Sequence, residues 1–187
     1  TGLEPFAGLP GTVGGAVVGN AGCFGLEIKD VIAEALVLNQ AMGSICSMDK
    51  SSFGFFYRSS GLKKTHDIVL QATFQLSHRS TDSISTPSAP ISRDTLRERA
   101  TKQPPGKSSG SFFKNPFPND STQPTAGQLI DQCGLKGFQI GGAQISSKHG
   151  NFFMNTGSAT AADILALRDH AKKAVLDRFG IELHEEV

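Results

Sequence analysis

The segment Thr160–Gly180, TAADILALRDHAKKAVLDRFG, carries the strongest secondary-structure signal in the chain. Thr160 is a favourable helix N-cap, and Asp163 three positions later gives a close relative of the capping box. Gly180 supplies a left-handed stop at the other end. Between them, five apolar residues recur at helical spacing and form one face: Ile164, Leu167, Ala171, Val175 and Phe179. The sequence therefore predicts one long helix over residues 160–179.

Two apolar stretches nearer the start of the chain favour strands. Val31–Leu38 is apolar and branched enough for a buried strand, and Ile68–Leu76 ends in apolar/polar alternation. Ile181 and Leu183 are expected to begin a further strand beside the long helix. Strands and helices in this mixture predict an α+β fold.

Two shorter helices are also predicted. Ser92–Gln103 is a polar helix that Pro104 and Pro105 stop, because proline lacks the amide and restricts the residue before it. Ala126–Cys133 is a second short helix, which Gly134 closes.

Composition divides the chain into two parts. In residues 77–92, ten of sixteen are Ser, Thr or Pro, which is typical of a linker or an exposed loop. We therefore predict a first domain over residues 1–77, a linker over 78–92 and a second domain over 93–187.

Charge and cysteine content exclude several classes of protein. Among 187 residues, Lys plus Arg number 18 and Asp plus Glu 17, so the net charge of +1 argues against nucleic-acid binding. No run of 18 apolar residues exists, and the start of the chain lacks a signal peptide. Three widely spaced cysteines disfavour a disulfide framework and a zinc site. We expect a cytoplasmic protein with no membrane partner and no metal, and the absent initiator Met suggests a piece of a longer chain.

The first candidate motif is glycine-rich. Residues 1–25 hold eight glycines, and Gly8–Ala16 continues to Asn20-Ala21-Gly22. Glycines let main-chain amides crowd round a phosphate, but neither a Walker loop nor a G-x-G-x-x-G after a strand is present. From spacing alone, anion binding and a tight turn both remain open.

Four further motifs carry polar groups suited to a binding or catalytic site; three of them centre on a single residue, and the fourth is the segment Ser109–Pro116. Arg58, between Tyr57 and two serines, is either a carboxylate ligand or a surface charge. His149, within residues 141–152, is either a general acid or substrate ligand or a solvated side chain. Glu186 lies at the chain end, where glutamates usually face solvent.

The segment Ser109–Pro116 places a hydroxyl, an ammonium and an amide around two phenylalanines. An extended conformation would put Ser111, Phe113 and Asn115 on one face and Phe112 and Lys114 on the other. The polar face then lines a pocket or forms the rim of an edge strand.

Taken in order, these motifs resemble one family. They are Gly-Leu-Pro-Gly-Thr-Val-Gly-Gly-Ala at 8–16, Tyr-Arg-x-Ser at 57–60, Gly-Ser-x-Phe-Lys-Asn-Pro at 110–116, Ala-Gly-x-Leu-Ile at 126–130, Lys-His-x-Asn-Phe at 148–152 and Leu-x-x-Glu-Val at 183–187. The set resembles the UDP-N-acetylenolpyruvoylglucosamine reductase family over nearly the whole chain, in its shorter subtype. The N-terminal half of that family's flavin-binding region is absent here.

The resemblance implies a fold, a reaction and a set of partners. The fold would be the second lobe of a vanillyl-alcohol-oxidase-like (PCMH) FAD-binding domain, followed by an α+β substrate-binding domain. The reaction would be NADPH- and FAD-dependent reduction of UDP-N-acetylglucosamine enolpyruvate to UDP-N-acetylmuramate in peptidoglycan precursor synthesis. The partners would be the UDP-sugar and NADPH, and the protein would be a monomer.

The resemblance also implies residue roles. Ser111 would donate a proton to the substrate carbanion. Arg58, as a cation, and Glu186, as a protonated acid, would bracket the substrate carboxylate. The residues that fall where the family lines FAD are Pro10, Gly11, Thr12, Gly14, Gly15, Asn20 and Gly22. Those that fall where it handles the UDP-sugar are Lys114, Asn115, His149 and Asn151.

Two alternatives remain. One is another FAD-dependent oxidoreductase of the same binding class, such as an alcohol or lactate oxidase, against which the motif at 110–116 and the final Glu-Val argue. The other is a non-catalytic descendant, against which the joint presence of Arg58, Ser111 and Glu186 argues.

Overall fold

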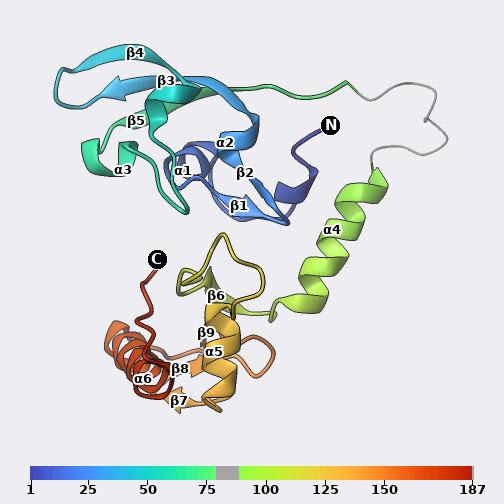
Figure 1. The fold of residues 1–187 in the computed structure, drawn as a ribbon, viewed down its shortest axis with the longest axis vertical. Coiled ribbons are helices and arrows are strands. Elements are labelled where there is room, and N and C mark those ends of the chain that lie inside the picture. The colour runs from blue at the N-terminus through green and yellow to red at the C-terminus, as the bar shows by residue number, and fades with distance from the viewer. Residues whose placement is uncertain (79–88, 187) are drawn as a thin grey trace. The chain divides into compact units, whose positions relative to one another are not determined.

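The computed structural model describes residues 1–78 and 89–186. The chain forms two compact units, Thr1–Glu98 and Arg99–Val187. Helices and strands mix in both, and every described strand pairing is antiparallel. The mixed helix-and-strand class predicted from the sequence is confirmed. Figure 1 shows the order of the elements.

The first unit is built around a three-stranded sheet of order β4-β3-β5. The α1 helix packs against β5, and its Val17 joins Ile32, Val37 and Phe53 in the buried core. The elements in chain order are η1 (Glu4–Phe6), α1 (Val13–Val18), β1 (Gly22–Cys23), β2 (Leu26–Glu27), α2 (Ile28–Val31), β3 (Ile32–Asn39), β4 (Ser44–Asp49), η2 (Lys50–Phe53), α3 (Leu62–Thr65) and β5 (Ile68–Phe74).

Both strands predicted in this unit are present as β3 and β5, with ends shifted by one or two residues. The β4 strand escaped prediction because Ser44–Asp49 is exposed along nearly its whole length and lacks an apolar alternation. It forms because it completes a hairpin with β3, from Asn39 opposite Ser44 to Glu34 opposite Asp49.

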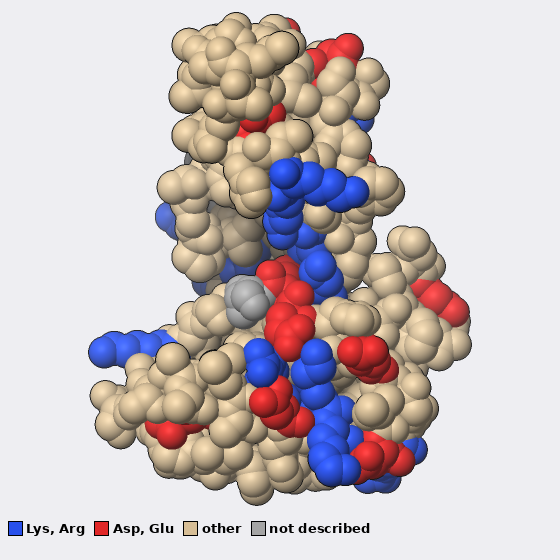
Figure 2. All heavy atoms as spheres, turned by 90° about the vertical axis from the view of Figure 1, so that its left-hand side faces the viewer, with Lys and Arg blue, Asp and Glu red and all other residues tan. Residues whose placement is uncertain are grey.

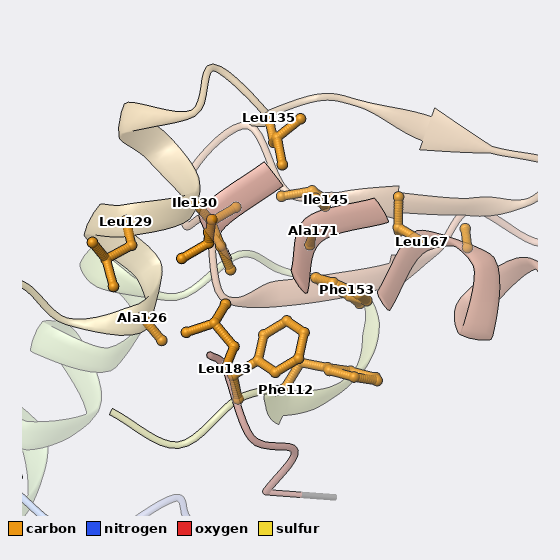
Figure 3. Packing of buried hydrophobic residues seen from close by; sticks show 13 residues of the cluster. Phe112, Ala126, Leu129, Ile130, Leu135, Ile145, Phe153, Leu167, Ala171 and Leu183 are labelled. Carbon is orange, nitrogen blue, oxygen red and sulfur yellow. The ribbon is translucent and has the colours of Figure 1, made fainter. Parts of the chain in front are cut away.

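The second unit is built around a four-stranded sheet of order β6-β9-β8-β7, with α6 packed on β7 and β8. Its core gathers side chains from the sheet, from α5 and α6 and from Leu183 near the chain end, as Figure 3 shows. Its elements are the end of α4 (Ala89–Lys102), then β6 (Lys107–Ser111), α5 (Ala126–Gln132), β7 (Gln139–Ile140), β8 (Ala143–Ile145), β9 (Phe152–Asn155) and α6 (Ala161–Phe179).

The α6 helix confirms its prediction in detail. The Thr160 hydroxyl accepts from Asp163 N, the Asp163 carboxylate accepts from Thr160 N, and Gly180 lies in the left-handed region. Leu167, Ala171 and Val175 are fully buried on its inner face. With 19 residues it is the longest helix in the described part of the chain. The helix predicted at 126–133 is also confirmed as α5, with Thr125 as its N-cap.

Three expectations need correction. The polar helix begins at Ala89 rather than Ser92. The residues after α6 form a single isolated bridge, Glu185 with Phe113, instead of a strand starting at Ile181. Phe112 and Phe113 do not alternate between two faces: the strand ends at Ser111, and both rings are buried in one core, 5.1 Å apart.

Most of the predicted linker, residues 79–88, lies outside the described residues. The three cysteines are free thiols. No helix within residues 1–78 and 89–186 is long and apolar enough to cross a membrane.

Candidate functional site

Ser111 lies at the end of β6, directly after a bulge in the pairing with β9. Ser108 faces Met154 and Ser111 faces Phe152, so β6 holds one residue more than its partner over this span. Gly110, within the bulge, has a φ of +91°, which suits glycine and few other residues. A bulge locally re-aims the side chain that follows it, and Ser111 is that side chain.

The side chain of Asn151 is hydrogen-bonded to the backbone of Phe113, two residues after Ser111. Its side-chain amide donates to Phe113 O at 2.7 Å and its oxygen accepts from Phe113 N at 2.9 Å. Phe112 N donates to the carbonyl of Asn151 at 2.8 Å. Asn151 is 3% exposed, so these bonds are made in a buried environment.

Glu186, near the end of the sequence, is hydrogen-bonded to the backbone of Phe112. Its amide donates to Phe112 O at 2.8 Å, and Lys114 N donates to His184 O at 2.9 Å. Phe113 pairs with Glu185 between these two bonds. Glu186 therefore lies opposite Phe112, the residue that follows Ser111.

Asn115 connects this region to the start of α5. Its side-chain oxygen accepts from Ala126 N at 3.1 Å, which satisfies one of the amides left open at a helix N-terminus. Lys114, next to it, is partly exposed and its backbone is tied to the segment that carries Glu186.

His149 packs over the same helix start. A Cβ added at Gly127 would lie 3.0 Å from its Cε1, and its Nδ1 accepts from Asn151 N at 3.1 Å. Burial, followed by the positive charge of Lys136, lowers the pKa of His149 below its ordinary value of 6.5. The neutral ring then carries its proton on Nε2, the nitrogen left to donate to a ligand.

In the first unit, Arg58 lies in a two-residue turn between Phe56 and Ser59 with a φ of +55°. Its guanidinium donates to Gly22 O at 2.8 Å and lies 3.8 Å from the Glu27 carboxylate. A Cβ at Gly22 would come within 2.6 Å of Arg58 Nη1, so a glycine is needed there for this approach. Arg58 and Gly22, predicted in different roles, are in contact.

Asn20 completes this cluster. It is fully buried, donates to Glu27 Oε2 at 3.0 Å and to Phe56 O at 2.9 Å, and accepts from Lys29 N at 2.9 Å. Its side chain thereby joins the β1–β2 hairpin to the turn that bears Arg58.

The glycine-rich segment leads into α1. Thr12 is the N-cap, its hydroxyl accepting from Gly15 N at 3.0 Å. Pro10, Gly11 and Thr12 are exposed, and Gly11 has a φ of +136° with open space where a Cβ would be. Gly14 lies against β5, where a Cβ would be 3.4 Å from Val69 O.

The predicted residues thus form two groups. Ser111, Lys114, Asn115, His149, Asn151 and Glu186 gather in the second unit around the backbone of Phe112 and Phe113. In the first unit, Arg58, Asn20 and Gly22 form one cluster, and residues 10–15 surround the start of α1.

Comparison with known proteins shows what the chain is similar to. Residues 101–187 match the family model described as UDP-N-acetylenolpyruvoylglucosamine reductase, C-terminal domain. The whole chain is 40% identical over 188 residues to UDP-N-acetylenolpyruvoylglucosamine reductase of Bacillus subtilis, and 43% identical over 187 residues to UDP-N-acetylenolpyruvoylglucosamine reductase 1 of Bacillus thuringiensis. Over its whole length the chain is therefore similar to UDP-N-acetylenolpyruvoylglucosamine reductases, and residues 101–187 match the C-terminal domain of that family.

A solved member of this reductase family has the same fold. The crystal structure of the Thermus caldophilus reductase superimposes with a TM-score of 0.80 at 36% identity, covering 100% of this chain and 63% of that one. The chain spans 59% of the length of each of the two Bacillus reductases. It therefore corresponds to a part of such a reductase.

The structure adds two residues near the candidate site that the sequence did not single out. Glu27 contacts Arg58, Asn20 and Lys29, yet no motif marks a glutamate at the end of so short a strand. Lys148 Nζ donates to Ala100 O and Gln103 O, at 2.7 and 2.9 Å, at the end of α4. Its position beside His149 in the Lys-His-x-Asn-Phe motif could have marked Lys148 as a candidate. Its partners could not be predicted locally, because they lie more than 40 residues away in sequence.

Proposed function

We propose that this chain is part of a reductase that converts UDP-N-acetylglucosamine enolpyruvate to UDP-N-acetylmuramate, using NADPH and FAD. Support comes from relatives of about 40% identity that carry the reductase name and match the chain over its full length. In this role the protein acts in peptidoglycan precursor synthesis, as a monomer in the cytoplasm.

One observation carries the proposal. The hydrogen bond from Glu186 N to Phe112 O, 2.8 Å, joins the last residues of the unit to the residue beside Ser111. A hydroxyl and a carboxyl separated by more than 70 positions in sequence thus lie on paired segments. Such a pair suits a substrate that has to receive a proton next to a carboxylate.

The first unit provides residues that fit FAD. An added Cβ at Gly11 would meet no atom within 4 Å, and the exposed loop of residues 10–12 precedes the amides of α1. Backbone amides of this kind suit phosphate oxygens. We assign Pro10, Gly11, Thr12, Gly14, Gly15, Asn20 and Gly22 to this cofactor region. FAD, when bound, would supply hydride transfer from NADPH to the enolpyruvyl carbon.

We assign Ser111 the role of proton donor. Reduction of the enolpyruvyl double bond adds a hydride to the terminal carbon and a proton to the carbon that bears the ether oxygen and the carboxylate. The electron pair of the double bond forms the second new C–H bond with the proton that Ser111 Oγ–H donates. The serine then regains a proton from solvent. A hydroxyl is a weak acid, and the strongly basic enolate makes it competent for this step.

Arg58 and Glu186 are assigned to the substrate carboxylate. Arg58 is a permanent cation whose fork-shaped guanidinium suits a carboxylate, and its contact with Gly22 O fixes its direction. Lys114, Asn115, His149 and Asn151 are assigned to the UDP-sugar side, where Lys114 offers a positive charge to a phosphate. Asn115 and Asn151 shape this side through their backbone contacts.

The test uses the purified full-length protein. Flavin absorbance is recorded first, and NADPH oxidation is then followed with and without UDP-N-acetylglucosamine enolpyruvate. The proposal expects bound flavin, oxidation of NADPH that depends on the enolpyruvyl sugar nucleotide, and UDP-N-acetylmuramate as product. A rate of NADPH oxidation that is the same without that substrate would overturn it.

A further inference from the structure

The segment that carries Glu186 is also held from its other side, by α6. Lys172 Nζ lies 3.2 Å from Glu185 Oε1 and 3.4 Å from Oε2. Arg168 Nε lies 3.5 Å from the same Oε1. We call these three residues the Glu185 ion cluster. Figure 2 shows basic and acidic side chains lying next to one another on one face of the molecule.

The positions of the two cations follow from the helix. Residues 168 and 172 are one turn apart on α6, so both reach the same side of the helix. The next residue along, Lys173, points elsewhere and pairs with Asp177 at 2.5 Å. Lys172 therefore contacts Glu185, whereas the adjacent Lys173 pairs within α6.

The backbone around Glu185 is extended by its bridge to Phe113, with Leu183 buried two residues before it. Successive side chains of an extended segment point to opposite sides. Glu185 is turned toward α6 by the ion cluster, so Glu186 is turned away from α6. By holding Glu185, the ion cluster thereby sets the direction of the Glu186 side chain.

We propose that Arg168 and Lys172 are positioning residues for Glu186, acting through Glu185. This inference rests on the proposed function, in which Glu186 meets the substrate carboxylate. The cluster members are between 27% and 31% exposed, and partly exposed ion pairs contribute little to global stability. Their effect is local: they limit rotation and fraying of the last residues.

The experiment compares variants of the full-length protein: Lys172→Met, the Arg168→Leu/Lys172→Met double variant, Lys172→Arg and the matched control Lys173→Met. Two properties are measured. Hydrogen exchange of the Glu186 amide reports the anchoring directly, and stopped-flow absorbance reports flavin reduction by NADPH and reoxidation by the enolpyruvyl substrate separately.

In the double variant, we expect faster exchange at Glu186 and a reoxidation step slowed by about 10- to 100-fold, because small displacements of a reacting group have effects of that size. Flavin reduction by NADPH and the melting temperature are expected to change little. Lys172→Arg should restore most of the rate, and Lys173→Met should behave as wild type.

Glu186→Gln separates this inference from the proposed function. If that change slows reoxidation and the double variant does not, the positioning role is wrong and the proposed function stands. If Glu186→Gln leaves reoxidation at the wild-type rate, the assignment of Glu186 fails and the positioning role fails with it. Equal slowing by Lys173→Met and Lys172→Met would also overturn the positioning role.

Discussion

The side chain of Asn151 is hydrogen-bonded to both backbone groups of Phe113, with its oxygen accepting from Phe113 N at 2.9 Å and its nitrogen donating to Phe113 O at 2.7 Å. A side-chain amide here takes the place of a neighbouring strand, because β6 has already ended at Ser111. The pairing continues the backbone toward Asn115, beyond the end of β6 at Ser111. Asn151 thus joins the core of the second unit to its candidate site.

Asn151→Ala should destabilise the second unit by roughly 2–4 kcal/mol, because it leaves two buried backbone groups of Phe113 without partners. Thermal unfolding checks this, and a lowering of the melting temperature by about 10 °C or more is expected. Asn119→Ala, at an exposed asparagine, is the control and should leave the melting temperature unchanged. A loss of activity from Asn151→Ala with unchanged stability would contradict the structural role.

Gly22→Ala should displace Arg58 without unfolding the first unit. The added Cβ would lie 2.6 Å from Arg58 Nη1 and 2.8 Å from Glu27 Cγ, and the arginine end is the more flexible of the two. Loss of one charge-assisted hydrogen bond corresponds to about tenfold in affinity. We expect KM for the enolpyruvyl substrate to rise by about that factor, measured on flavin-loaded protein because Gly22 is also assigned to the FAD region. An unchanged KM would show that Arg58 does not hold the substrate.

His149 should make the stability of the second unit depend on pH. Burial and the charge of Lys136 lower its pKa in the folded state below 6.5, so the unfolded chain binds its proton first as the pH falls. The contribution of neutral His149 is therefore fully present above about pH 6.5 and decreases as the pH falls toward the lowered pKa. Denaturant unfolding of wild type and His149→Gln between about pH 5 and pH 8 measures the difference.

Above pH 7 the two proteins should differ in unfolding free energy by a constant amount. Below pH 6.5 the wild type should lose more stability than His149→Gln. Parallel curves across the whole range would mean that His149 titrates alike in both states.

Local signals in the sequence identified helices α5 and α6 of the second unit but not its strands β7, β8 and β9. The two ends of α6 are set by residues at the ends themselves: Thr160 and Asp163 form the capping box, and Gly180 forms the left-handed C-cap. The bounds of this helix can therefore be predicted from its own sequence. The hairpin strand β4 is the opposite case. Its exposed, hydroxyl-rich residues have no pattern of their own, and its conformation depends on pairing with β3.

The candidate site shows the same division. Gly-Ser-x-Phe-Lys-Asn-Pro and the final Glu-Val were visible as motifs, but nothing local states that Glu186 pairs with Phe112 or that Asn151 holds Phe113. Alternation failed at Phe112 because a bulge and a strand end interrupt the regular period of two. Contacts between residues far apart in sequence, such as Arg58 with Gly22, needed the folded chain.

Ser111→Ala gives the sharpest test of the chemistry. In the full-length protein, flavin reduction by NADPH should keep nearly its wild-type rate, since Ser111 has no part in that half-reaction. Reoxidation by the enolpyruvyl substrate should slow by about 10²- to 10⁴-fold, the usual contribution of a general acid. Ser111→Cys should retain more activity than Ser111→Ala, because a thiol still donates a proton. Stopped-flow absorbance separates the two half-reactions.

The neighbouring Ser109 provides the matched control for Ser111. It is exposed on the same strand, within the register shift between Ser108 and Ser111, so Ser109→Ala removes an identical hydroxyl from a position outside the proposed chemistry. Both half-reactions should keep their rates in that variant. A serine that merely lines the rim of β6 would instead produce a small loss of stability at either position and similar rates in both half-reactions. Equal slowing of reduction and reoxidation by Ser111→Ala, or no slowing of either, would remove Ser111 from the role of proton donor.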